Sequence, residues 1–340
     1  MGIILILATQ CAPKLHRREG RPLSSASTLR NGRAVSSPSP EGARAVASGC
    51  RPIFVLGADR SGTSMISETI YRWGANAGDI TSLGGANEGN PRGYWEYEPM
   101  EELLDKLFAA AKVSPWHPEF PGRVRALARD PALRAEALRL AAGMEEGPAW
   151  FWKEPFLCRC LPFFMDIIPS PLFVVAIRNP YESALSYEKY ILPSTLRGTI
   201  RLRSLYLLRW QQLVVSVLEH AVNHPSVIYL PYVELVNDPA DQCGRLCAFL
   251  DRECGVDGDS TQRVQRMTQA VDPALRRNRG DRLFDTADEA TPTQRALFRH
   301  LLERVRDPAL PFSAADYPLP PGGREYLENA ELMLSMLRKM

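Results

Sequence analysis

The sequence predicts an α/β protein of three layers, in which a central parallel sheet is flanked by helices. Short apolar segments alternate along the chain with longer segments whose apolar residues recur at helical spacing. Apolar segments that no polar residue interrupts indicate strands buried on both faces. Strands that alternate with helices indicate a parallel sheet covered on both sides.

The predicted strands are the shortest and most apolar of these segments. Gly57 ends the first strand, Pro171 directly precedes the third, and Pro231 directly follows the fourth. Glycine and proline commonly mark the ends of such segments. The four strands are predicted over 53–56, 149–153, 172–177 and 227–230.

Helices are predicted where the apolar residues recur every three or four positions. Met65, Ile66 and Ile70 follow this spacing, and Gly74 ends their helix, which spans 63–73. Pro180 suits the first turn of the helix predicted over 181–190, because its missing N–H would be unpaired there. The other helices are predicted over 98–112, 124–144, 196–221, about 239–250 and 325–340, the last packing on the domain or on a second subunit.

Length and composition predict one folded domain with a tail at each end. The chain has 340 residues, enough for a single large α/β domain. We expect a disordered leader over 1–50, rich in Ser, Arg, Pro, Gly and Ala, a domain over 51–312, and an extension over 313–340. Residues 3–8 are apolar but far fewer than the roughly 20 that span a bilayer. No transmembrane segment is therefore expected, while a weak signal sequence and the place of the leader in the mature protein stay open.

Charge and cysteine content exclude several classes of protein. The formal net charge is +2, so the overall balance points to neither a nucleic-acid nor an anionic membrane partner. The seven cysteines lack the C-x2-C spacing and the nearby histidines of zinc sites, and their odd number argues against a full disulfide framework. We expect buried thiols in a reducing compartment, a cytoplasmic location and no metal.

The loop after the first strand has the chemistry of a phosphate site. Its glycines allow a close approach of the backbone, and the start of the following helix offers unpaired N–H groups. Arg60 adds a positive charge, and hydroxyl groups come from Ser61, Thr63 and Ser64, which flank Gly62. The glycine spacing also fits the nucleotide-triphosphate loop G-x4-G-K-[ST], but Thr63 stands where that loop has lysine. A kinase or NTPase that acts on a small molecule is therefore the alternative interpretation.

The two candidate anion sites resemble those of one enzyme family. Residues 60–64, Arg-Ser-Gly-Thr-Ser, resemble the 5′-phosphosulfate loop [KR]-S-G-T-[ST] of PAPS-dependent sulfotransferases. Residues 178–187 resemble the 3′-phosphate motif R-[ND]-P-x5-S-[YL] of the same family. The resemblance implies that PAPS is the donor and that Arg178 and Ser186 hold its 3′-phosphate, since an arginine can bind phosphate through two hydrogen bonds.

Further segments resemble the family in the same order. Residues 151–155 are similar to its K-[DE]-P segment and residues 232–239 to its Y-E-D-L-x-x-D-P segment. Residues 275–279 resemble a late basic segment that can close over the donor, which implies a donor-binding role for Arg277. The resemblance extends from about Pro52 to Arg279 and implies a P-loop-like fold, similar to that of nucleotide kinases, without their metal requirement.

The resemblance also implies a mechanism, in which the general base is uncertain. Arg60 and Lys153 would stabilise the leaving oxygen. Some members use the histidine of a K-x-H segment as the base, but Pro155 stands at that place. Glu96, in a segment similar to N-P-x-G-[YF]-[WF]-E, is the favoured base. Glu154 is the rival, because the neighbouring lysine would lower its pKa and make it the weaker base.

The acceptor cannot be read from the sequence. Carbohydrates, lipids, small metabolites and protein tyrosine are all compatible acceptors of the sulfuryl group. Loss of the histidine also leaves open an inactive relative that binds the nucleotide without turnover. A homodimer stays open as well.

Overall fold

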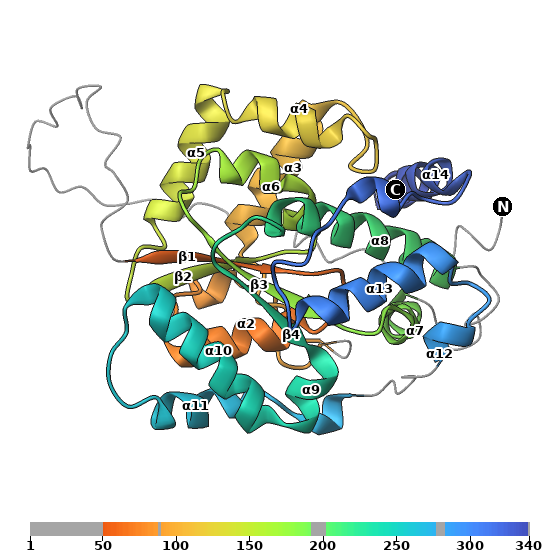
Figure 1. The fold of residues 1–340 in the computed structure, drawn as a ribbon. Helices are drawn as coiled ribbons and strands as arrows, with labels where there is room; N and C mark the ends of the chain where they lie inside the picture. The colour runs from red at the N-terminus through yellow and green to blue at the C-terminus, as the bar shows by residue number, and fades with distance from the viewer. Residues whose placement is uncertain (1–49, 88–89, 192–201, 277–282, 339–340) are drawn as a thin grey trace, which may run out of the picture.

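The structure is a computed structural model that describes residues 50–87, 90–191, 202–276 and 283–338. Four parallel strands form a central sheet with the order β2-β1-β3-β4 (Figure 1). This arrangement confirms the predicted fold class, and each strand lies within a residue or two of its predicted position. The strands are β1 (Arg51–Leu56), β2 (Ala149–Lys153), β3 (Leu172–Ile177) and β4 (Val227–Pro231).

Alternate residues of each strand face two different hydrophobic cores. In β1, Phe54 and Leu56 belong to one core, whereas Ile53 and Val55 belong to the other. All four side chains are buried. Burial on both faces is the physical reason that polar residues do not alternate with apolar ones in these strands.

Helices cover both faces of the sheet (Figure 1). One core is closed by α3 (Glu98–Ala111), α4 (Phe120–Leu127), α5 (Pro131–Ala142), α6 (Leu157–Met165), α7 (Pro180–Ile191), α8 (Leu202–Ala221) and α13 (Pro292–Arg304). The other is closed by α2 (Thr63–Trp73), α9 (Tyr232–Asn237), α10 (Pro239–Cys254) and α11 (Thr261–Thr268). The short α12 (Leu283–Thr286) contacts α7, and 3-10 turns span Ile80–Ser82, Pro273–Leu275 and Ala314–Asp316.

The single helix predicted over 124–144 is wrong, because the structure has two helices there, α4 and α5. Pro131 is the first residue of α5, and a residue that precedes proline is disfavoured in the helical conformation. Asp130 is accordingly extended, and its carboxylate accepts hydrogen bonds from the amides of Ala132 and Leu133. The aspartate thus caps the second helix where the first one has ended.

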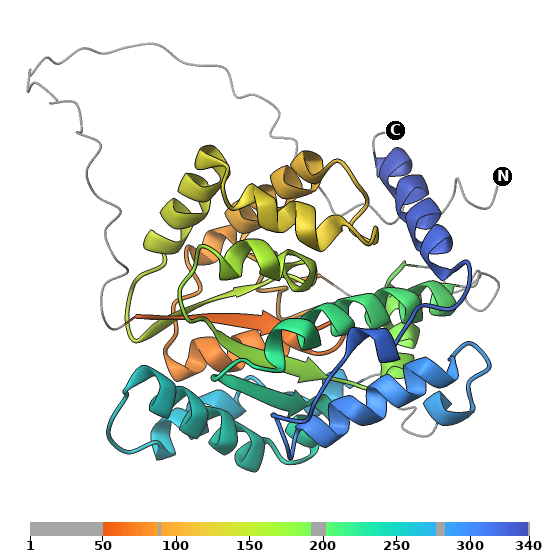
Figure 2. The same ribbon diagram turned by 45° about the horizontal axis from the view of Figure 1, so that its top comes forward.

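The structure describes most of the C-terminal extension but little of the expected leader. Nearly all of the expected leader, and residues 196–201 of the expected helix 196–221, lie outside the described residues. The predicted terminal helix is present as α14 (Gly323–Arg338), which contacts α8 and stands out from the body of the molecule in Figure 2. Its Leu327 is buried.

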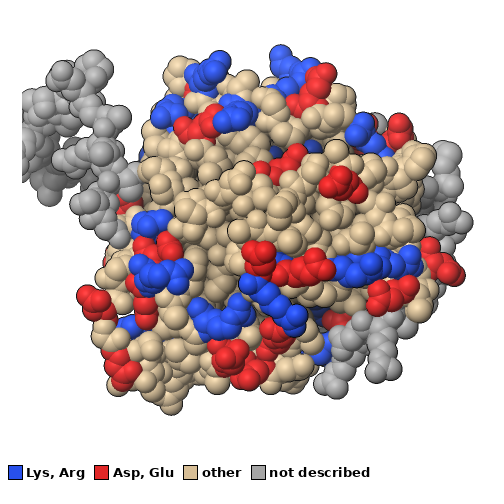
Figure 3. Space-filling view, viewed as in Figure 1, with Lys and Arg blue, Asp and Glu red and all other residues tan. Residues whose placement is uncertain are grey.

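Charged side chains of both signs are mixed on the surface (Figure 3), and most of the described cysteines are buried. On the face seen in Figure 3, basic and acidic side chains are interspersed and no large area carries one sign alone. The six cysteines of the described residues are free thiols, and Cys158, Cys160, Cys243 and Cys247 are buried. In the described part of the chain, no helix has both the length and the hydrophobicity of a membrane span, and no three potential ligands gather around a possible metal position.

Candidate active site

The predicted site residues that the structure describes gather at the carboxyl end of the sheet. The four strands run in the same direction, toward the side of the molecule where α7 lies (Figures 1 and 2). Lys153 is the last residue of β2, Arg178 follows β3 and Tyr232 follows β4, while residues 57–62, here called the donor loop, follow β1. Ligands of open α/β sheets bind at this edge.

The backbone of the donor loop lies close to an aromatic side chain at Gly62. Gly62 has a φ of 96°, and a Cβ atom at this position would lie 2.5 Å from Cδ2 of Tyr232. Only glycine fits there without a shift of the neighbouring ring. α2 begins at Thr63 without a side-chain cap, so the amides of its first turn have no partner within the helix and suit an anion.

The hydroxyl groups of Ser61 and Ser64, in the donor loop and at the start of α2, form hydrogen bonds within the protein. Ser61 donates its hydroxyl hydrogen to the carbonyl oxygen of Ala58 at 2.6 Å, which tightens the turn. The hydroxyl oxygen of Ser64 accepts a hydrogen bond of 3.1 Å from Asn90. Ser61 therefore contributes to the shape of the loop, a role that its residue type alone did not reveal.

The two segments with predicted anion sites meet at Arg60. Its Nε donates to the hydroxyl oxygen of Ser186 at 3.1 Å, and its backbone carbonyl accepts a 3.0 Å hydrogen bond from Nη1 of Arg178. More than one hundred residues of sequence separate these groups. The structure thus brings Arg60, Arg178 and Ser186 together, as one nucleotide with phosphates at both positions would require.

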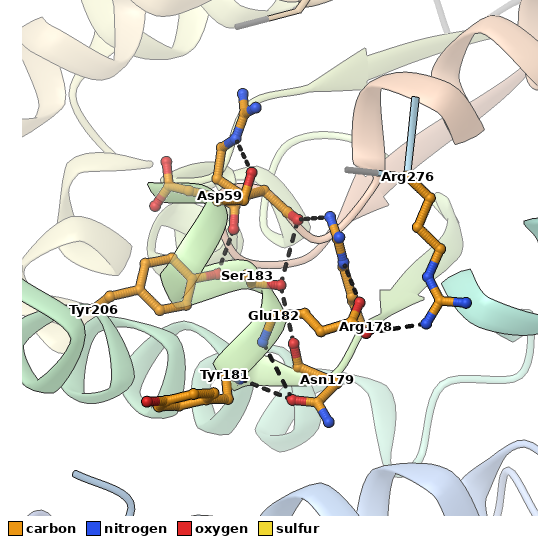
Figure 4. Close-up of polar contacts among 10 residues, drawn as sticks. Asp59, Arg178, Asn179, Tyr181, Glu182, Ser183, Tyr206 and Arg276 are labelled. Atoms are coloured by element: carbon orange, nitrogen blue, oxygen red, sulfur yellow. Dashed lines mark hydrogen bonds and ion pairs between the residues drawn. The ribbon is translucent and has the colours of Figure 1, made fainter. Parts of the chain in front are cut away.

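A buried carboxylate links two arginines at this site (Figure 4). Glu182 accepts hydrogen bonds from Nε of Arg178 at 3.3 Å and from Nη2 of Arg276 at 3.0 Å. The guanidinium of Arg178 also lies 4.2 Å from the ring centre of Tyr232. Two arginines thus share this one buried carboxylate. Sequence reasoning missed Glu182 and Arg276, while Arg277, which it named, lies outside the described residues.

Lys153 and Glu96 form an ion pair next to the donor loop. The ammonium group also donates to the carbonyl oxygen of Tyr94 at 3.0 Å, and the lysine side chain is only 4% exposed. Trp95, between the two partners, has a left-handed φ of 60° and packs its ring 5.1 Å from that of Tyr71. This turn directs both the Tyr94 carbonyl and the Glu96 carboxylate toward the lysine.

The pKa expected for Glu154 is wrong. Because Lys153 pairs with Glu96, its charge is only a minor influence on Glu154. Burial raises the pKa of Glu154 well above its ordinary value, and the negative charges of Glu96 and Asp59 raise it further. Burial likewise raises the pKa of the nearby Glu101 to about 7. Two carboxyl groups near Lys153 therefore have raised pKa values.

Comparisons with known proteins show the family of the chain. Residues 52–255 match the sequence model of the Sulfotransferase family. No curated protein matches the chain. The chain is similar to three solved structures at 16–17% identity, all described as sulfotransferases or sulfotransferase domains.

The three structures resemble the chain only distantly. The domain from the olefin synthase of Synechococcus PCC 7002 is 17% identical with a TM-score of 0.40, over 84% of this chain and 95% of that chain. Sulfotransferase STF9 of Mycobacterium avium is 17% identical with a TM-score of 0.41, over 76% and 77%. The domain from the curacin biosynthetic pathway is 16% identical with a TM-score of 0.35, over 83% and 98%. No conclusion about substrates follows from likeness at this level. The family match is different, because it covers more than half of the chain and includes both segments with predicted anion sites: this chain belongs to the Sulfotransferase family.

Proposed function

We propose that this protein transfers a sulfuryl group from PAPS to a hydroxyl or amine group of an acceptor. The contact between Arg60 and Ser186 carries the proposal, because it joins the loop for the 5′-phosphosulfate to the helix for the 3′-phosphate. PAPS has anionic groups at both of these positions. ATP lacks the 3′-phosphate and would leave Arg178 and Ser186 without a ligand.

Each donor group has residues of suitable chemistry. The 5′-phosphosulfate would lie against the amides of Gly62, Thr63 and Ser64, at the start of α2. The 3′-phosphate would accept hydrogen bonds from Arg178 and Ser186, and Arg276, which shares Glu182 with Arg178, lies close to this position. No metal ion is required in this arrangement, because the charge of the donor is met by arginines and backbone amides.

The reaction requires in-line attack and removal of one proton. The acceptor oxygen or nitrogen forms a bond to sulfur, while the bond between sulfur and the 5′-phosphate oxygen breaks and adenosine 3′,5′-bisphosphate leaves. Arg60 and Lys153 stabilise the charge that develops on the leaving oxygen. Two contacts engage Lys153 in the structure, and an ammonium group has three N–H donors, so one remains for the donor.

Glu96 is the proposed general base. Its carboxylate is 19% exposed, so an acceptor can reach it, and it pairs with Lys153 beside the proposed leaving group. Transfer to water, measured as release of adenosine 3′,5′-bisphosphate from PAPS, tests this assignment without a known acceptor. We expect Glu96→Gln to reduce this rate by about 100-fold or more and Glu154→Gln to reduce it far less. The reverse order would assign the base to Glu154, the pKa of which is raised by burial.

Calorimetry with nucleotides tests the proposed donor. We expect adenosine 3′,5′-bisphosphate to bind in the absence of Mg²⁺ and more tightly than ADP or ATP. Arg178→Ala should weaken this binding by about 1–3 kcal/mol, the size of a charge-assisted hydrogen bond. Arg125→Ala is the control, because Arg125 lies on α4 and pairs with Asp166, which follows α6 and has no part in the proposed donor site. Binding of ATP that depends on Mg²⁺ would instead favour a kinase or NTPase.

The acceptor and the location of the protein stay predictions. Carbohydrates, lipids and small metabolites fit the proposal equally well. The free thiols of the described residues are compatible with the expected cytoplasmic location.

A further inference from the structure

Helix α8 holds the donor loop at Asp59, a residue to which the proposed function assigns no role. The carbonyl oxygen of Asp59 accepts a hydrogen bond from the hydroxyl group of Tyr206. Its carboxylate Oδ2 accepts one from Nη2 of Arg209 at 3.0 Å. Tyr206 and Arg209 lie three positions apart on α8 and are buried. One helix thus holds both the backbone and the side chain of this loop residue, and Figure 4 shows Tyr206 pointing at the backbone beside Asp59.

Aromatic rings fix the guanidinium group of Arg209. It lies 5.3 Å from the ring centres of Trp116 and Phe156 and 5.8 Å from that of Tyr187. These rings come from three separate segments of the chain. A planar guanidinium packs well against aromatic faces, and its exclusion from water strengthens its ion pair. The direction of the Arg209 side chain, and with it the position of Asp59, is therefore set by the protein core.

The next residue of the loop needs such support. Arg60 has a φ of 62°, in the left-handed region that residues with a Cβ atom rarely adopt. Strained backbone of this kind persists only where surrounding contacts enforce it. Tyr206 holds the carbonyl before this strained residue, while Arg178 and Ser183 hold its own carbonyl at 3.0 and 3.3 Å. Fixing two successive carbonyl groups also fixes the directions of the amide groups that follow.

We propose that Arg209, together with Tyr206, positions the donor loop through Asp59 and so keeps the amide groups of residues 62–64 directed at the donor. Neither residue needs to touch the donor. Arg209 also contacts Phe156, which directly follows Pro155. It therefore connects the donor loop to the segment that contains Lys153. The naming of the donor rests on the proposed function, whereas the contact between α8 and the loop does not.

A matched pair of variants tests this role. Arg209→Met removes the ion pair but keeps a long side chain among the rings. Arg159→Met is the control, because Arg159 is equally buried and lies 5.8 Å from the ring of Phe120, but it donates to the carbonyl oxygen of Pro115. Both variants should lower the unfolding temperature. Only Arg209→Met should weaken binding of adenosine 3′,5′-bisphosphate, by about tenfold, and speed hydrogen exchange of the amides of residues 58–64.

A second pair of measurements tests whether Arg209 acts through Asp59. Residues that act as one unit give non-additive effects. We therefore expect Asp59→Asn to weaken nucleotide binding alone, and to add little in the Arg209→Met background. Additive effects, or equal effects of Arg209→Met and Arg159→Met on binding and exchange, would overturn the proposal. If the wild type binds no adenosine 3′,5′-bisphosphate, the proposed function fails, and unchanged exchange in Arg209→Met would then overturn the positioning role independently.

Discussion

Replacing Glu182 by glutamine should destabilise the protein and at the same time increase the stabilisation that a bound nucleotide confers. The change keeps the shape of the side chain but removes the charge between Arg178 and Arg276. The carboxylate side chain is 2% exposed, and those of the two arginines are 9% and 7% exposed. Water therefore screens little of the interaction, and two cations would remain beside each other without their shared anion.

The magnitude follows from this burial. Removing one partner of a buried ion pair costs about 3–5 kcal/mol. The amide oxygen of glutamine still accepts one hydrogen bond, so we expect a loss of about 2–4 kcal/mol of unfolding free energy. With a urea dependence of about 3 kcal/mol per molar, the midpoint of unfolding would fall by roughly 1 M.

The assay is urea unfolding with and without adenosine 3′,5′-bisphosphate. The nucleotide should stabilise Glu182→Gln more than the wild type, because its 3′-phosphate replaces the missing anion. Glu119→Gln is a matched control: Glu119 also pairs with an arginine four residues away, Arg123, but both side chains are largely exposed, and no measurable change is expected. An unchanged midpoint in Glu182→Gln would refute the view that Glu182 balances the two arginines. If the nucleotide stabilises the wild type and the variant equally, the proposed link between Glu182 and the 3′-phosphate is refuted.

Two further predictions concern the donor loop and the pH dependence of stability. Gly62→Ala should abolish detectable nucleotide binding in calorimetry, because its Cβ atom would lie 2.5 Å from the ring of Tyr232 at a φ of 96°; Gly244→Ala in α10, where a Cβ meets no atom within 4 Å, should leave binding unchanged. Burial and the adjacent Arg304, which donates to Nε2 of His300, lower the pKa of His300. The unfolded chain then binds more protons, so this contribution to stability is present above the unfolded pKa of about 6.5 and is lost as the pH falls below it. His300→Gln should therefore lose less stability than the wild type between about pH 7.5 and about pH 5.5, measured as urea midpoints; identical losses would contradict this reasoning.

The strands and the donor loop were predictable because their signals are local. Because the strands are buried on both faces, polar residues do not interrupt them. A glycine-rich turn before a helix can be recognised from a few adjacent residues. The break at Asp130 was also readable, since a capping residue followed by proline marks a helix start. Apolar residues continue at helical spacing on both sides of this break, and that periodicity concealed it.

The partners of the site residues were not predictable, because tertiary structure chooses them. Glu182 lies four positions after Arg178, so their contact was within reach of helical spacing. Its second partner, Arg276, lies 94 residues further along the chain. Similarly, nothing in the sequence of α8 distinguishes Arg209 from a solvated arginine, and its partner Asp59 lies 150 residues away.

The charge state of the candidate bases depends on three-dimensional structure in the same way. The neighbour of Glu154 in sequence is Lys153, but this lysine turns to Glu96, 57 residues away. Sequence proximity thus predicted a lowered pKa for Glu154, whereas burial raises it.

The central claim is that Arg178 and Ser186 form a site for the 3′-phosphate of a nucleotide. The most direct test compares the binding of adenosine 3′,5′-bisphosphate with that of adenosine 5′-monophosphate, in the wild type and in Arg178→Ala. We expect the wild type to prefer the bisphosphate, and the variant to lose most of this preference while its weaker binding of the monophosphate changes little. A wild type without preference, or an equal loss of affinity for both nucleotides in the variant, would contradict the claim.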